Sequence, residues 1–273
     1  MRKIIILLVL VSAVCSTQAQ RSSDTTALIK ELNDVMSFAV QPYLHYSSVI
    51  SLRRGPMVDT AGTGTVLHNE FYKVQDDLYY GNEQEEIYLQ DSLMVRISHA
   101  RKMIQLSRVD VSTKKRIDLM PLKRADMQRL MREHCTLSGA PGQGDTDQIV
   151  IRSQEKQAPQ GLTSSEMAVT YRRDTHLPVL MELSMHVRQD ETEEMVELLK
   201  TQGFDVGKME VEQDGKKTLG MTQTASVSFE GIEMTKEKAM GMPVWTAQVG
   251  YDDQSKNFSG KGRCEGYEVI KTF

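Results

Sequence analysis

Histidines are the side chains best suited to bind a transition metal or to exchange a proton near neutral pH. The chain has six of them, scattered along its length. No two lie four residues apart, the spacing that would place both imidazoles on one metal ion from one face of a helix. We therefore predict no metal site and no cofactor. The histidines are at positions 45, 68, 99, 134, 176 and 186.

Carboxylates are the next candidates for acid–base chemistry, and the chain has adjacent acidic pairs. Neighbouring residues on a strand point to opposite faces, so adjacency alone does not build a catalytic pair. We therefore expect these side chains to lie in solvated turns. The pairs are Asp76-Asp77, Glu85-Glu86, Glu193-Glu194 and Asp252-Asp253.

The motifs of nucleophilic catalysis and phosphate binding are absent or incomplete. No Gly-x-Ser-x-Gly sequence occurs, so a serine hydrolase of that type is not indicated. Gly139-x-x-Gly142-x-Gly144 lacks the Lys-Ser/Thr of a phosphate-binding loop, and we expect a flexible, exposed loop there. We predict that the chain is not an enzyme and has no catalytic residue. A hydrolase whose side chains converge only in three dimensions is the least favoured alternative.

Composition narrows the class of protein further. The chain has 273 residues, of which 40% are hydrophobic and 26% charged, as in an ordinary globular protein. Its net charge of −4 and pI of about 5.9 argue against nucleic acid as a partner, because such proteins usually carry a basic face. Methionine is unusually frequent, with 17 residues against 9 Tyr, 6 Phe and 1 Trp. A core of this kind is adaptable.

The N-terminus has the pattern of a secretory signal peptide. Arg2 and Lys3 precede an apolar run from Ile4 to Val14, and Thr17-Gln18-Ala19 supplies small residues before a cut at Gln20. The run is too short to span a membrane, and no later run approaches the ~18 apolar residues that a spanning helix needs. We predict a signal peptide over residues 1–19 and a periplasmic mature chain without a transmembrane segment.

Two cysteines remain after the signal peptide, Cys135 and Cys264. An oxidising compartment permits a disulfide between them. The alternative is two buried thiols that pack as small apolar residues, and the sequence leaves both possibilities open.

Hydrophobic periodicity predicts a chain of short strands with a few helices. Asp190 and Glu193 have the spacing of a capping box at the start of one helix, and Asp214-Gly215 is typical of a hairpin turn. We predict an α+β fold, mainly antiparallel, in a single domain over residues 20–273. Helices are expected at 24–38, 123–136 and 190–200, and strands at 43–53, 65–74, 86–90, 93–98, 102–109, 148–154, 166–172, 179–187, 225–230, 244–251 and 264–272.

The strongest alternation lies in two of these strands, and it defines the candidate binding residues. If the two strands share a sheet, their apolar side chains form one surface. That surface is either a packed core or the lining of a cavity that holds an acyl chain, closed by the helices at 24–38 and 123–136. The residues are Leu44, Tyr46, Ile50, Leu52, Met181, Leu183 and Met185.

The order of these elements resembles the LolA/LolB-like superfamily of periplasmic lipoprotein carriers. The resemblance is carried by Gly62-Thr63-Gly64-Thr65-Val66, by the hairpin over 86–95, and by Tyr171–Pro178 with the alternating strand that follows. It covers residues 24–190, and the remainder would be a C-terminal extension. It implies an unclosed half-barrel sheet, covered by helices, around a hydrophobic cavity for lipoprotein acyl chains. Where the family's carriers have a functional arginine, this chain has His68-Asn69.

From these features we expect a non-enzymatic periplasmic carrier or binding protein for a lipid or lipoprotein acyl group. The main alternative is an envelope protein–protein interaction module on the same fold, with a filled core and no lipid ligand. The expected partners are accordingly lipid or lipoprotein acyl chains, or other envelope proteins.

Overall fold

The computed structural model describes residues 25–56, 63–90, 92–109, 135–153, 162–201, 203–213 and 216–272. The predicted signal peptide and residues 123–134 of the predicted second helix lie outside these ranges. The chain divides into two compact units. The first unit comprises Met1–Val35, Arg53–Thr63 and Arg124–Ala225, and the second comprises Met36–Leu52, Gly64–Lys123 and Ser226–Phe273. The long strands β1 and β12 each contribute residues to both units.

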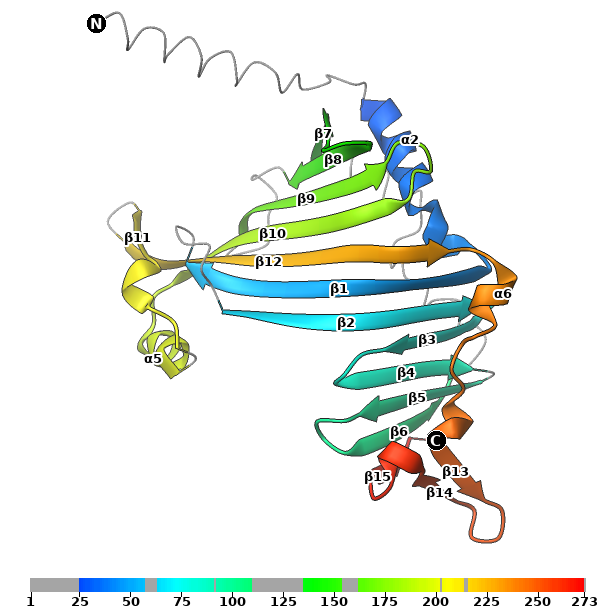
Figure 1. Ribbon diagram of the computed structural model, residues 1–273. Helices are drawn as coiled ribbons and strands as arrows, with labels where there is room; N and C mark the ends of the chain where they lie inside the picture. The colour runs from blue at the N-terminus through cyan, green and yellow to red at the C-terminus, as the bar shows by residue number, and fades with distance from the viewer. Residues whose placement is uncertain are drawn as a thin grey trace, which may run out of the picture. The chain divides into compact units, whose positions relative to one another are not determined.

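Most described elements are strands of one unclosed, mainly antiparallel sheet (Figure 1). Its strands pair in the order β15-β6-β5-β4-β3-β2-β1-β12-β10-β9-β8-β7, with β11 paired to β12, and the two ends of this path do not pair with each other. The prediction of a mainly antiparallel β fold is confirmed. The strands are β1 (Tyr43–Pro56), β2 (Thr63–Val74), β3 (Asp77–Gly81), β4 (Glu85–Gln90), β5 (Leu93–Ser98), β6 (Met103–Arg108), β7 (Cys135–Pro141), β8 (Thr146–Ser153), β9 (Leu162–Arg172), β10 (Pro178–Asp190), β11 (Glu210–Gln213), β12 (Lys216–Glu233) and β15 (Glu268–Lys271).

The second unit contains an antiparallel meander, β2 to β6, in which each strand pairs with the next. Strand alternation gives this meander two faces. On one face the cross-strand pairs are almost all apolar or aromatic, and we name this set the covered face. It consists of Tyr79, Tyr88, Val95, Ile97, Ile104 and Leu106, all of them buried. The sequence predicted β2, β4, β5 and β6 but not β3.

Four aromatic rings pack together elsewhere in the second unit. Phe38 lies in the short 3-10 helix η1 (Ser37–Val40) and meets Tyr46 of β1 and Phe229 of β12 edge-on. Tyr46 also stacks on Phe71 of β2, with ring centroids 5.0 Å apart. These contacts join three strands and the segment after the first helix into one core.

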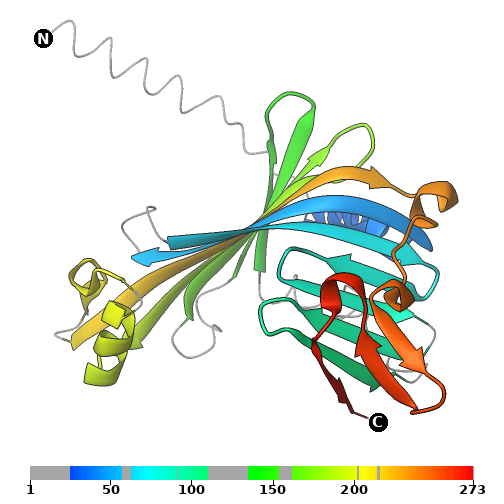
Figure 2. The same cartoon turned by 60° about the horizontal axis from the view of Figure 1, so that its bottom comes forward.

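The C-terminal segment, residues 242–272, packs on the covered face of the meander (Figure 2). Val249 and Cys264 from this segment are buried in the same cluster as the meander residues. Its last strand, β15, pairs with β6 in parallel, the one parallel pairing among those described here. The segment also contains η4 (Trp245–Ala247), β13 (Val249–Asp252), β14 (Asn257–Gly260) and η5 (Gly262–Cys264), and it follows the short helix α6 (Lys236–Ala239).

The first unit contains β7, β8, β9 and β10 in antiparallel order, with residues 216–225 of β12 beside β10. Two helices belong to it. The first is α2 (Thr25–Met36), whose buried stripe includes Leu28, Ile29 and Leu32, as the predicted amphipathic helix requires. The second is α5 (Glu193–Thr201), which packs with the 3-10 helix η3 (Val206–Lys208) and with β12.

The predicted cap of α5 is corrected by the structure. Asp190 lies in β10, and the backbone N–H of Met195 instead donates to Thr192 Oγ1 at 3.3 Å, so Thr192 is the capping residue. The helix ends at Thr201, one residue beyond the predicted Lys200, and Gly203, which was predicted to stop it, has a positive φ of 82°.

Four other predicted boundaries are wrong. Cys135 and Thr136, assigned to a helix, begin strand β7, and Gly139 to Pro141, assigned to an exposed loop, continue that strand. The turn itself is confined to residues 142–145. The strands expected at 244–251 and 264–272 begin later, because η4 and η5 occupy their first residues.

Burial in α5 can be tested with two adjacent leucines. Leu199 is 3% exposed and packs on Met209 and Leu219, whereas Leu198 is 52% exposed. We expect Leu199→Ala to lower the free energy of unfolding by about 3 kcal/mol, since it leaves a cavity. Leu198→Ala should change it by less than about 0.5 kcal/mol. Urea unfolding followed by circular dichroism measures both, and equal effects would contradict this packing.

Candidate functional site

An apolar row on β10 is the clearest candidate for a ligand-binding surface. Met181, Leu183 and Met185 alternate along the strand and therefore point to one face of the sheet. We name these three residues the β10 row. Each is partly exposed, so no described element covers the row completely.

Apolar side chains from neighbouring strands extend the surface of the row. In the antiparallel register Met181 lies opposite Val169 and Leu183 opposite Met167, both on β9. Val169 and Met167 in turn lie opposite Ile149 and Ile151 of β8. Val169, Ile149 and Ile151 are buried, whereas Met167 is partly exposed like the row. The same face thus passes from a packed region on β8 and β9 to a less covered region on β10.

The other side of the row adjoins the core beneath α5. His186 Nδ1 lies 3.0 Å from Thr222 Oγ1, so the even-numbered residues of β10 and β12 share one face. The odd-numbered residues Leu219 and Met221 of β12 are therefore on the same face as the β10 row. They are buried against Leu199 of α5. The row lies between two packed regions on one face of the first unit.

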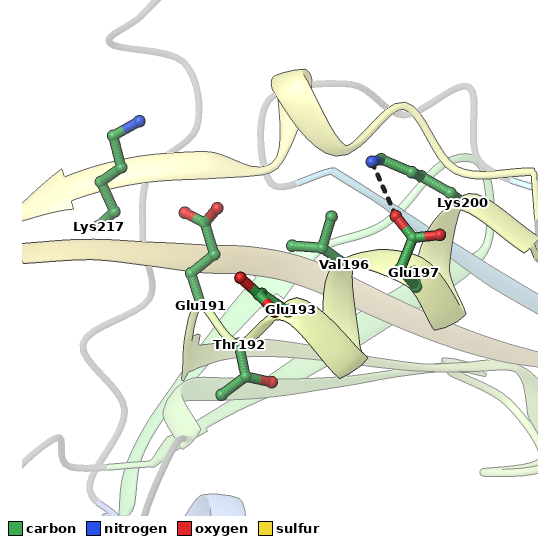
Figure 3. Close-up of a pocket in the computed structure, with 7 residues that line it drawn as sticks. All are labelled: Glu191, Thr192, Glu193, Val196, Glu197, Lys200 and Lys217. Carbon is green, nitrogen blue, oxygen red and sulfur yellow. Dashed lines mark hydrogen bonds and ion pairs between the residues drawn. The ribbon is translucent and has the colours of Figure 1, made fainter.

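A polar pocket of about 580 Å³ lies beside α5 (Figure 3). Two of its lysines have carboxylate neighbours, Lys200 with Glu197 at 3.1 Å and Lys217 with Glu210 at 3.5 Å. It contains none of the residues predicted to bind a ligand, and its charged lining does not suit an acyl chain. The lining residues are Glu191, Thr192, Glu193, Val196, Glu197, Lys200 and Lys217.

The seven predicted binding residues do not belong to one compact unit. The β10 row lies in the first unit, whereas Leu44, Tyr46, Ile50 and Leu52 lie in the second. Leu44 is fully buried, and Tyr46 is held among aromatic rings. Leu52 is 46% exposed, and Ile50 is partly exposed. Leu44 is thus a core residue and Tyr46 packs within an aromatic cluster, whereas the β10 row keeps the features of a binding surface.

Glu86 is a buried carboxylate that the sequence placed in a solvated turn, and that prediction is wrong. Only 1% of its surface is exposed. Its Oε1 accepts hydrogen bonds from His99 Nε2, at 2.7 Å, and from Arg263, while its Oε2 accepts one from the Tyr88 hydroxyl. His99 Nδ1 lies 3.2 Å from the Tyr267 hydroxyl. Arg263 lies 177 residues away in sequence, so no local pattern could have revealed this cluster.

Asn69, at the position where the resembling family has its arginine, is the centre of a buried hydrogen-bond network. Its Oδ1 accepts from the Tyr80 hydroxyl at 2.6 Å and from Asn82 Nδ2 at 3.0 Å. Its Nδ2 donates to the backbone carbonyls of Ser48 and Leu67. A side chain that is satisfied in this way holds β1, β2 and β3 together and does not face a ligand. The neighbouring His68 is exposed.

The described residues contain no disulfide, no cluster of metal ligands and no membrane-spanning helix. Cys135 and Cys264 are both free thiols, and burial raises the pKa of each. No group of three His, Cys, Asp or Glu side chains within the described ranges is arranged to hold a metal ion. None of the described helices is long and apolar enough to cross a membrane.

Comparisons with known proteins add little to the site. No protein-family model and no curated protein matches the chain. Among solved structures, the chain is similar to a DUF1329 family protein from Desulfovibrio piger, with 12% sequence identity and a TM-score of 0.29. The match covers 86% of this chain and 100% of that chain. A TM-score this low carries no argument about fold or function.

The buried tyrosines of the second unit predict a fall in stability at high pH. Burial raises the pKa of Tyr46 and of Tyr79 from about 10 to about 12, and burial with the Glu86 hydrogen bond raises the pKa of Tyr88 further. Each folded-state pKa exceeds the unfolded one, so the stabilisation is complete below pH 10 and is lost as the pH rises through 12.

We expect the free energy of unfolding to fall between pH 10 and 12. Tyr46→Phe or Tyr79→Phe should make that fall smaller. The exposed Tyr251 provides the control, since Tyr251→Phe should leave the fall unchanged. Denaturant titrations across this range measure the effect, and a flat profile in the unaltered protein would refute the assignment.

Proposed function

We propose that this protein is a periplasmic carrier or binding protein for a lipid or lipoprotein acyl group, and that the acyl chain lies along the β10 row. The supporting observation is that Met181, Leu183 and Met185 are aligned on one face and partly exposed between packed apolar regions. An apolar strip of this kind gains free energy when an acyl chain displaces water from it.

The chemistry of the row suits a flexible hydrocarbon. Methionine is unbranched and polarisable, so its side chain adapts to ligands of different shape. Each methylene buried is worth about 0.8 kcal/mol, so a chain of about ten carbons can bind without any charged contact. None of the residues that line the polar pocket beside α5 belongs to this row, so the pocket has no part in the proposed acyl-chain binding.

We further propose that the sheet forms a half-barrel. An unclosed antiparallel sheet, with α2 and α5 in the unit that contains the β10 row, is compatible with the half-barrel implied by the resemblance to the LolA/LolB-like superfamily. In that arrangement the helices border the acyl chain and the sheet supports it. A position in the periplasm rests on the predicted signal peptide.

A protein–protein interaction module is the second candidate, and a different observation favours it. Met234, Met240 and Val244 lie close together in sequence in the second unit and are 43%, 61% and 51% exposed. Exposed apolar side chains that cluster on a surface often mark a site of protein association. This candidate predicts co-purification of a protein partner and no bound lipid.

Native mass spectrometry and lipid extraction of protein purified from the periplasm provide the first test. We expect a bound lipid in the native spectrum and fatty acyl chains in the extract. The purified protein should also bind a fluorescent fatty acid. If neither assay detects lipid, the acyl-carrier proposal fails.

Charges introduced into the β10 row test its role. We expect Met181→Asp with Met185→Asp to weaken binding of the fluorescent fatty acid at least roughly tenfold, because the acyl chain would lie against two carboxylates. The fold should persist in circular dichroism, since both side chains are partly exposed and their carboxylates reach water.

The matched control is Ser184→Asp, which places a carboxylate on the opposite face of the same strand. It should bind the fatty acid as tightly as the unaltered protein. If the control loses binding as well, or if the double variant binds normally, the acyl chain does not lie on this face.

A further inference from the structure

Three polar side chains on the covered face of the meander bond to the C-terminal segment. Glu86 and Gln90 are buried residues of β4, and His99 follows β5. Buried polar groups on an apolar sheet face are costly unless they are hydrogen-bonded. Each of the three has a partner in one continuous segment of the chain, residues 242–272, and Glu86 also bonds to Tyr88 and His99 of the meander.

The bonds at Gln90 run in both directions. Its Nε2 donates to the Pro243 carbonyl at 2.8 Å, and its Oε1 accepts from the Trp245 backbone N–H at 3.2 Å. The amide therefore holds the start of the segment at two adjacent points. At the other end of β4, Glu86 accepts from Arg263, and His99 meets the Tyr267 hydroxyl. We name Glu86, Gln90 and His99 the clasp.

The meander does not need the C-terminal segment to complete its own hydrogen bonds. Strands β2 to β6 pair with one another in continuous antiparallel ladders. The segment adds only the four-residue strand β15 at the edge of β6. Its other strands, β13 and β14, form a separate two-stranded sheet. Removing the segment would open one edge and one face while every ladder within the meander stayed intact.

Two apolar side chains near the start of the segment make little apolar contact, although Ala239 and Met242 beside them are packed. Met240 is 61% exposed and Val244 is 51% exposed, on either side of the point where the segment reaches Gln90. Gly241 lies between them. The side chains of Met240 and Val244 can change conformation without disrupting a packed core.

Buried ion pairs of the clasp type fix position more than they add stability, because desolvation offsets much of their Coulombic attraction. The clasp therefore specifies one docked arrangement of the segment without fastening it strongly.

We propose that residues 242–272 act as a strap that docks on and leaves the covered face as one unit, while the meander stays folded. The open state exposes a second apolar face, formed by Tyr79, Tyr88, Val95, Ile97, Ile104 and Leu106. This face is different from the β10 row, and the inference stands whether or not the protein carries lipid.

Native-state hydrogen exchange of the full-length protein tests the strap. The Glu268 and Thr272 amides donate to the meander carbonyls of Lys102 and Leu106, so their exchange reports undocking. We expect them to exchange at least roughly tenfold faster than the ladder amides of β5. Equal rates, which would mean that both regions open only in global unfolding, would overturn the proposal.

Arg263→Gln tests the clasp without touching the meander core, because Arg263 is 56% exposed and lies on the strap. We expect the Glu268 and Thr272 amides to exchange several-fold faster in this variant and the β5 amides to be unchanged.

The matched control is Arg173→Gln in the first unit, where an exposed arginine pairs with Asp147 at 2.9 Å. It should leave the strap amides unaffected. If Arg263→Gln accelerates exchange in β5 as much as in the strap, the segment is an integral part of the meander core and the proposal fails.

Discussion

Side-chain alternation is the constraint on which this structure depends. A β-strand presents successive residues to opposite faces, so an antiparallel sheet can leave one face to water while its apolar face must be covered or used. The meander of the second unit meets this requirement on one face with the C-terminal segment. In the first unit, α5 and η3 cover the face at β12 and leave the β10 row partly exposed.

The α5–η3 pair and the C-terminal segment are held against the sheet by different kinds of contact. The core beneath α5 is apolar and is built from Leu199, Val206, Met209, Leu219 and Met221. The C-terminal segment also packs through apolar residues, but it is positioned by buried polar groups, above all Glu86. An apolar contact tolerates sliding, whereas a hydrogen-bonded carboxylate accepts its partners in one arrangement. The helices α5 and η3 are therefore held by apolar packing, whereas the C-terminal segment docks in one register.

The sequence predicted those parts of the fold that local periodicity determines. The strict alternation of β10 and the amphipathic pattern of α2 were read correctly, because both depend on residues close in the chain. Strand β3 was missed because Leu78, Tyr79 and Tyr80 are consecutive, so the strand shows no alternation of apolar and polar residues. Cys135 was assigned to a helix because it continues the spacing of Met127 and Met131, whereas its pairing with Ser153 places it in β7.

The candidate site residues also differ in whether a local sequence pattern could reveal them. Met181, Leu183 and Met185 could be proposed from alternation alone. Their partial exposure then distinguished them from the buried Leu44, and the aromatic packing of Tyr46 set that residue apart. The burial of Glu86 could not be predicted, because it depends on Arg263, His99 and Tyr88, which share no local pattern with it. The excess of methionine acquires a physical meaning in the first unit, where Met167, Met181 and Met185 occupy the less covered part of the apolar face.

The central claim is that an acyl chain lies on the β10 row, and photolabelling with a diazirine-bearing fatty acid tests it most directly. Trypsin cleaves after Arg173 and Arg188, so the row lies within the single peptide 174–188. The account predicts that the label is concentrated in this peptide and is displaced by unlabelled fatty acid. Label confined to other peptides, or label that unlabelled fatty acid does not displace, would contradict it.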